Sequence, residues 1–209
     1  MDFQIWLAFV AASTALLLIP GPTVLLVLSY AISQGKRVAL ATVGGVALGD
    51  FIAMSASLAG LGALVLASAT LFTVLKWVGA LYLIYLGIKL FRSAPTASLG
   101  DLEQVAETRA SSVFGHATAV TALNPKSIVF FIAFVPQFIV VESPILPQFA
   151  ILIATFVGLA ALNALAYALL ADKLRAKIAR PSVLAWFARL GGSALIAMGV
   201  ATAAFKRAQ

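Results

Sequence analysis

Long apolar runs separated by short polar segments dominate this sequence of 209 residues. Each run is at least as long as the ~20 residues that an α-helix needs to cross the hydrocarbon core of a bilayer. The pattern therefore predicts an all-α membrane protein with six transmembrane helices. The predicted spans are Phe3–Ser33, Val38–Leu66, Leu71–Phe91, Val113–Gln137, Leu146–Ala171 and Val183–Phe205.

Two of the predicted helices contain residues that interrupt a helix. Pro20-Gly21-Pro22 lies within the first span, and Asn124-Pro125 lies within the fourth. Proline inside a helix costs about 3 kcal/mol because it removes a backbone donor and clashes with the preceding turn. Broken backbone is tolerated inside a membrane only where protein or a water-filled cavity satisfies it, and each break creates a half-helix terminus that can receive a carboxylate. The alternative is a pair of packing kinks, but two breaks at matching positions favour a binding site.

The two halves of the chain resemble each other. "ATVGGVALGD" at 41–50 aligns with "ATFVGLAALN" at 154–163, and "GALYLIYLG" at 79–87 aligns with "GGSALIAMG" at 191–199. In the same register "IPGP" falls opposite "LNPK". Three spans per half is an odd number, so the second copy would be inserted upside down. The result is a 3+3 inverted repeat, an architecture of many secondary transporters. Chance similarity between small-residue helices is the alternative.

Two charged residues lie deep within the predicted spans. Asp50 is the only acid in any of them, and Lys126 directly follows the break in the fourth. An ionised side chain at this depth costs roughly 2.5–3.5 kcal/mol on insertion scales, so each should face the bundle and have a partner. Burial disfavours the charged form of a carboxylate, which suits a group that gains and loses a proton. The alternatives are a structural ion pair for Asp50 and a lysine that extends to the interface for Lys126. Asn163 occupies the position equivalent to Asp50 in the second half.

Small residues recur every four positions in the second span, at Ala41, Gly45, Gly49 and Ala53. Such a stripe allows close helix packing, and glycines within it can also leave space for a ligand. The predicted substrate-binding residues are Pro20, Gly21, Pro22, Gly45, Gly49, Asp50, Asn124, Pro125 and Lys126, with Asp50 also coupling transport to protons.

Composition and charge support the membrane assignment. The chain is 63% hydrophobic and 10% charged, whereas a soluble domain carries about 25% charge. The net charge of +7 resides in short loops, which disfavours a nucleic-acid partner. Zero cysteines exclude disulfides and thiolate chemistry, and no cofactor or metal site is expected.

The loop charges also predict the orientation. Three basic residues lie on one side (Lys76, Lys206 and Arg207) and nine on the other: Lys36, Arg37, Lys89, Arg92, Arg109, Lys173, Arg175, Lys177 and Arg180. The positive-inside rule then places both termini outside the cytoplasm. We expect one transmembrane domain over residues 1–209, with repeat one at about 3–91, a cytoplasmic linker at about 92–112 and repeat two at about 113–205.

In combination, "IPGP", "GGVALGD", "GALYLIYLG" and "LNPKSIVFFIAFVPQF" resemble the LysE/RhtB family of bacterial amino-acid exporters over nearly the whole chain. The resemblance implies proton-driven efflux of amino acids across the inner membrane. In that membrane the loop charges predict that both termini lie in the periplasm. The branch that exports lysine and arginine typically reads Asn-Pro-His with an aspartate four residues later, whereas this chain has Lys126 and then Phe130. It is more similar to the homoserine/threonine branch, which implies a neutral, zwitterionic substrate or a derivative.

The resemblance implies a transporter and not an enzyme. The expected partners of this transporter are a small amino acid, protons and the bilayer, and a homodimer is left open. The alternatives are a metal-ion or other small-solute exporter, an intramembrane aspartyl protease and a channel. A metal exporter needs clustered acids, His or Cys within the spans, and an aspartyl protease needs two facing carboxylates. One acid, Asp50, and one peripheral His, His116, are too few for the metal exporter, and Asp50 alone is available for the protease.

Overall fold

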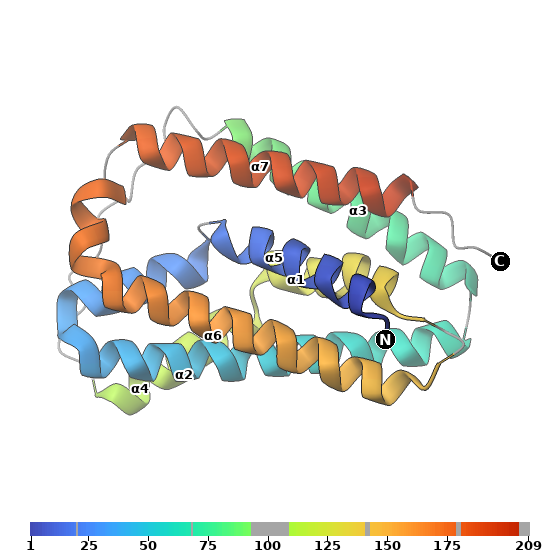
Figure 1. Ribbon diagram of the computed structural model, residues 1–209, viewed down its shortest axis with the longest axis horizontal. Helices are drawn as coiled ribbons and strands as arrows, with labels where there is room; N and C mark the ends of the chain where they lie inside the picture. Colours follow the sequence, from blue (N-terminus) through green and yellow to red (C-terminus); the bar gives the residue numbers. More distant parts are fainter. Residues whose placement is uncertain (20, 68, 93–108, 141–142, 179–180, 205–209) are drawn as a thin grey trace.

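The computed structural model describes residues 1–19, 21–67, 69–92, 109–140, 143–178 and 181–204, which form helices without any strand (Figure 1). The α-helices are α1 (Phe3–Leu18), α2 (Pro22–Ala67), α3 (Ala69–Arg92), α4 (Ala110–Ala122), α5 (Pro125–Val129), α6 (Ile145–Ile178) and α7 (Pro181–Ala204). After α5 the chain continues as a π-helical turn, η2 (Phe130–Phe134), and a 3-10 turn, η3 (Val135–Phe138).

The helices change direction near both proline sites. α1 is inclined by 60° to the first part of α2, Pro22–Ala31, and α4 is inclined by 41° to Pro125–Phe138. Local sequence explains where α5 starts, because Asn124 caps its amino end and Pro125 takes the first helical position. Two segments, Val38–Gly60 and Ile145–Ala171, are long and apolar enough to cross a membrane, and the described residues supply up to four spans if each bent pair counts as one.

The boundary predicted between the first two spans is helical. Residues 34–37 lie inside α2, which runs from Pro22 to Ala67 and changes direction at the left of Figure 1. The polar residues there favour helix as readily as loop, and the single glycine costs only about 1 kcal/mol. The expected loop between Ser33 and Val38 is therefore wrong at the level of secondary structure.

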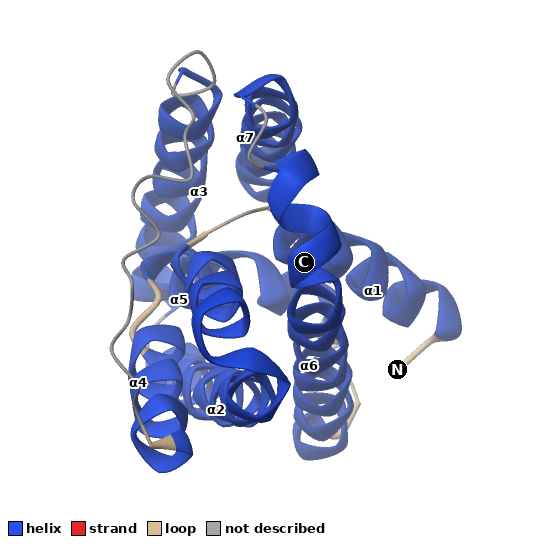
Figure 2. Cartoon of the chain, turned by 90° about the vertical axis from the view of Figure 1, so that its left-hand side faces the viewer, coloured by secondary structure: helices blue, strands red, loops and turns tan. Residues whose placement is uncertain are grey.

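The helices form two outer layers with α1 and α5 between them (Figure 2). α3 packs against α7 on one side, and α2 packs against α4 and α6 on the other. Glycines allow the α3–α7 crossing, because a Cβ on Gly87 would lie 2.6 Å from the Gly192 carbonyl oxygen. This contact between backbones is typical of small-residue crossings in membrane helices.

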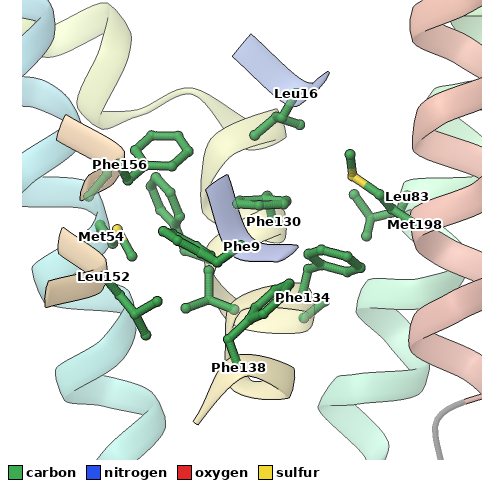
Figure 3. Packing of buried hydrophobic residues seen from close by; sticks show 14 of the residues in the cluster. Phe9, Leu16, Met54, Leu83, Phe130, Phe134, Phe138, Leu152, Phe156 and Met198 are labelled. Carbon is green, nitrogen blue, oxygen red and sulfur yellow. The ribbon is translucent and has the colours of Figure 1, made fainter. Parts of the chain in front are cut away.

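Two separate groups of buried apolar side chains fill the molecule. One, the aromatic cluster, is built around Phe9, Leu16, Ile19, Met54, Leu83, Phe130, Phe131, Phe134, Phe138, Leu152, Phe156 and Met198 (Figure 3). The other, the small-residue cluster, consists of Val24, Val27, Leu28, Ala31, Ala39, Val46, Ala164, Tyr167, Ala168 and Ala171. The space between these clusters holds the polar residues described next.

Candidate functional site

A cavity of about 460 Å³, counting the space that opens to solvent, lies between the two clusters. Leu16 and Ala160 of the aromatic cluster line one end, and Val27, Val46 and Tyr167 of the small-residue cluster line the other. Its remaining polar lining comes from Thr23, Asp50, Asn124, Lys126, Ser127 and Asn163. The cavity therefore combines these polar groups with apolar lining from both clusters.

Asp50 supplies the carboxylate of the cavity. Its side chain comes from the middle of α2 and is 3% exposed. No residue in the described part of the chain donates a hydrogen bond to it or forms a direct ion pair with it. Lys126 lies close enough to interact with it electrostatically. A buried carboxylate without a direct partner is costly, which favours a proton or a cationic ligand at this position.

Lys126 supplies the cationic group, and most of its hydrogen-bonding capacity is already used. Its Nζ donates to the carbonyl oxygen of Leu16 at 3.2 Å and to that of Ile19 at 3.0 Å. An ammonium group has three hydrogens, so one remains for another acceptor. A Cβ on Gly21 would lie 3.3 Å from this Nζ, so the glycine leaves room for the lysine side chain.

Two asparagines satisfy further backbone groups at the breaks. Asn163 of α6 donates from Nδ2 to the Leu17 carbonyl oxygen at 3.1 Å. The Asn124 side chain accepts from the Lys126 amide at 3.1 Å and donates to the Thr23 hydroxyl at 3.3 Å. Side chains therefore replace the helical partners that the backbone lacks at these positions, as interrupted helices in a membrane require.

The structure brings four of the predicted site residues to the cavity: Gly21, Asp50, Asn124 and Lys126. Pro22 and Pro125 are exposed and begin α2 and α5 without lining the cavity, and Pro20 lies outside the described residues.

Gly45 and Gly49 pack against α4 and do not line the cavity. A Cβ on Gly49 would lie 2.7 Å from the Thr118 carbonyl oxygen, and one on Gly45 would lie 2.8 Å from the Ala117 Cβ. The space beside these glycines is filled by helix backbone, so the structure supports the packing interpretation of the stripe.

Other cavity residues were not among those predicted: Thr23, Ser127, Asn163 and Tyr167. The internal repeat held the signal for Asn163, because this residue aligns with Asp50. Tyr167 follows Asn163 by one helical turn and so shares its face of α6. Thr23 and Ser127 each lie one or two residues beyond a break, but their types alone carry no functional signal.

Comparison with known proteins gives a consistent result. The sequence profile of the LysE type translocators matches residues 5–204. A homoserine/homoserine lactone efflux protein from Salmonella typhimurium is 35% identical over 209 residues, which is 100% of both chains. A membrane protein from Vibrio cholerae is 35% identical over 99% of this chain and 100% of its own length. A leucine efflux protein from Klebsiella pneumoniae is 31% identical over 138 residues, 66% of this chain and 65% of that protein. No solved structure matches the chain.

Proposed function

Because this chain belongs to the LysE translocator family of membrane proteins, we propose that it exports a neutral amino acid or a close derivative from the cytoplasm by proton antiport. The names of its relatives refer to homoserine, homoserine lactone and leucine. All three compounds carry an amino group and no cationic side chain. The homoserine and leucine type of substrate is therefore the best choice for first tests.

The observation that carries the proposal is the buried Asp50 carboxylate, which lines the cavity and has no direct partner among the residues that the structure describes. We propose that Asp50 binds the ammonium group of the substrate. The substrate's carboxylate then takes the remaining hydrogen of Lys126, near the amino end of α2 at Thr23, where the helix dipole favours an anion. The second half-helix terminus contributes less, because Asn124 already accepts from the Lys126 amide.

Proton coupling follows from competition for the same carboxylate. A protonated Asp50 carries no charge and attracts an ammonium group poorly, whereas an ionised Asp50 attracts it strongly. Asp50 takes a proton from the outside when the site is empty, and it releases that proton to the cytoplasm before the next substrate binds. Proton and substrate thus occupy the site in turn, which is the requirement for antiport.

The architecture that goes with this mechanism is six spans in a 3+3 inverted repeat, in the bacterial inner membrane, with both termini in the periplasm. The bends at both proline sites and the mutual packing of α3 and α7, the last helix of each half, support the repeat. Asn163 also supports it, because this equivalent of Asp50 lies on the same cavity.

Transport into inside-out membrane vesicles tests the proposal. An acidic lumen should drive accumulation of labelled homoserine or leucine in vesicles that contain the protein. Asp50→Asn keeps the size of the side chain but removes its titrating charge, so we expect accumulation to fall to the level of empty vesicles. A matched control is Asp2→Asn, the same change at the exposed amino cap of α1, where asparagine caps equally well. Normal accumulation by Asp50→Asn, with protein levels equal to the parent, would disprove the role of Asp50.

A further inference from the structure

The carboxyl end of α1 is held by side chains that line the cavity. The last carbonyl groups of a helix lack partners within it and carry partial negative charge, so a cation stabilises them. Lys126 binds the carbonyl oxygens of Leu16 and Ile19, and Asn163 binds that of Leu17. Three carbonyl groups in one turn therefore accept hydrogen bonds from two residues of other helices, and that of Leu16 also accepts one from the Ile19 amide at 3.3 Å.

The same turn of α1 belongs to the aromatic cluster. Leu16 is 0% exposed and Ile19 is 3% exposed, and both pack within that cluster. Two turns earlier in α1, the Phe9 ring contacts the Phe138 ring edge-on, with centroids 5.3 Å apart. Figure 3 shows Leu16 and Phe9 beside the phenylalanine rings of η2 and η3. A movement of the α1 end would therefore reach the packing that closes this side of the cavity.

We propose that Lys126 and Asn163 form a latch on the carboxyl end of α1, through which binding in the cavity controls the aromatic cluster. With the site empty, Lys126 donates to Leu16 and Ile19 and keeps α1 packed. A substrate carboxylate that binds the remaining hydrogen of Lys126 carries a full charge, and it draws the ammonium group away from these carbonyl oxygens. The α1 end then loses the two bonds from Lys126, and the aromatic cluster loosens. Lys126 and Asn163 are thus positioning residues for α1. Only release by the substrate rests on the proposed function.

The two ends of α1 provide a matched control. At its amino end, the Trp6 indole nitrogen donates to the Thr155 hydroxyl of α6 at 3.0 Å. This bond joins α1 to the same helix that carries Asn163 but lies away from the cavity. Thr155→Val removes it, and the latch proposal expects no opening of the cluster from this change.

Single cysteines can report on the packing, since the natural chain contains none. Ala15→Cys places a thiol in α1 beside the aromatic cluster, and Ala168→Cys places one in the small-residue cluster. The measurement is the rate of N-ethylmaleimide labelling of the purified protein in detergent. Lys126→Met preserves the length of the side chain but donates no hydrogen bond. It should speed labelling of Ala15→Cys about tenfold or more, as expected for loss of a charge-assisted hydrogen bond.

The other variants define the latch. Asn163→Leu should give a smaller increase, because it removes one bond and no charge, and an unchanged rate would exclude Asn163 from the latch. Thr155→Val should stay within about twofold of the parent. Labelling of Ala168→Cys should not change in any background. An unchanged labelling rate of Ala15→Cys in Lys126→Met would overturn the proposal. A similar increase in Thr155→Val, or faster labelling of both Ala15→Cys and Ala168→Cys, would also overturn it, because either would indicate general loosening of the protein.

Release by substrate has its own measurement. Homoserine or leucine should speed labelling of Ala15→Cys in the parent protein and have no further effect in Lys126→Met. If Lys126→Met speeds labelling of Ala15→Cys but neither amino acid does so in the parent protein, control by the substrate is overturned. Lys126 and Asn163 would then hold α1 in a purely structural role. This assay uses no proton gradient, so its outcome is separate from that of the Asp50→Asn transport experiment.

Discussion

The two clusters that line the ends of the cavity are packed in different ways. The aromatic cluster draws large side chains from every layer of the bundle, including α1, η2, η3 and α6. The small-residue cluster comes from α2 and α6 alone and consists mainly of alanine and valine, with Tyr167 at the cavity. Interlocked rings fill space in a way that a small displacement disrupts, whereas alanines let two helices approach closely with little side-chain volume between them. The first arrangement therefore resists displacement through its ring packing, whereas the second depends on how closely α2 and α6 approach.

The largest expected effect comes from removing a ring at the aromatic end. Phe130 is 0% exposed and its ring lies beside those of Phe131, Phe134 and Phe156. Phe130→Ala should lower the free energy of unfolding by about 3–5 kcal/mol, because it leaves a cavity among rigid neighbours. Thermal unfolding of the purified protein in detergent measures the loss. Val27→Ala at the other end is the control and should cost clearly less, so equal losses would contradict the difference between the two ends.

An intermediate effect comes from a small residue that lies at a helix crossing. A Cβ on Gly49 would lie 2.7 Å from both the Thr118 carbonyl oxygen and the Thr121 Cβ. Gly49→Ala should therefore push α2 from α4 and destabilise the protein by about 1–3 kcal/mol, the usual cost of overpacking. Gly158→Ala in α6 is the matched control, because no atom lies within 4 Å of the added Cβ. That control should be neutral or slightly stabilising in a thermal-shift assay, since alanine is the better helix former. A harmless Gly49→Ala would show that α2 and α4 do not need this contact.

The smallest expected effect concerns a polar contact near the small-residue end. The Tyr30 hydroxyl lies 3.0 Å from His116 Nδ1, which joins α2 to α4. Tyr30→Phe should cost about 0.5–1.5 kcal/mol, the net value of a typical hydrogen bond. A double-mutant cycle with His116→Ala isolates the interaction, and the two changes should be less than additive in their effect on unfolding. Full additivity would mean that the contact contributes nothing to stability.

The sequence by itself determined the helical class, the membrane assignment and the two charged residues of the cavity. These features depend on the composition of single segments. A run of apolar residues favours helix in a bilayer wherever it packs, and an isolated Asp50 or Lys126 within such a run must face protein. The start of α5 is also determined by local sequence, because Asn124 and Pro125 favour the amino end of a helix in any context.

Only the tertiary structure decided what these groups contact. The carbonyl groups that Lys126 binds are 107 and 110 positions away in the chain, and no local pattern specifies them. The glycine stripe favours helix packing and also allows ligand space, and the position of α4 places Gly45 and Gly49 in packing. Residues 34–37 were polar enough for a loop yet remained helical within α2. In each case the sequence determines which groups need partners, and the packing of distant helices supplies those partners. The reason is that hydrogen bonds and close contacts depend on distance in space and not on separation along the chain.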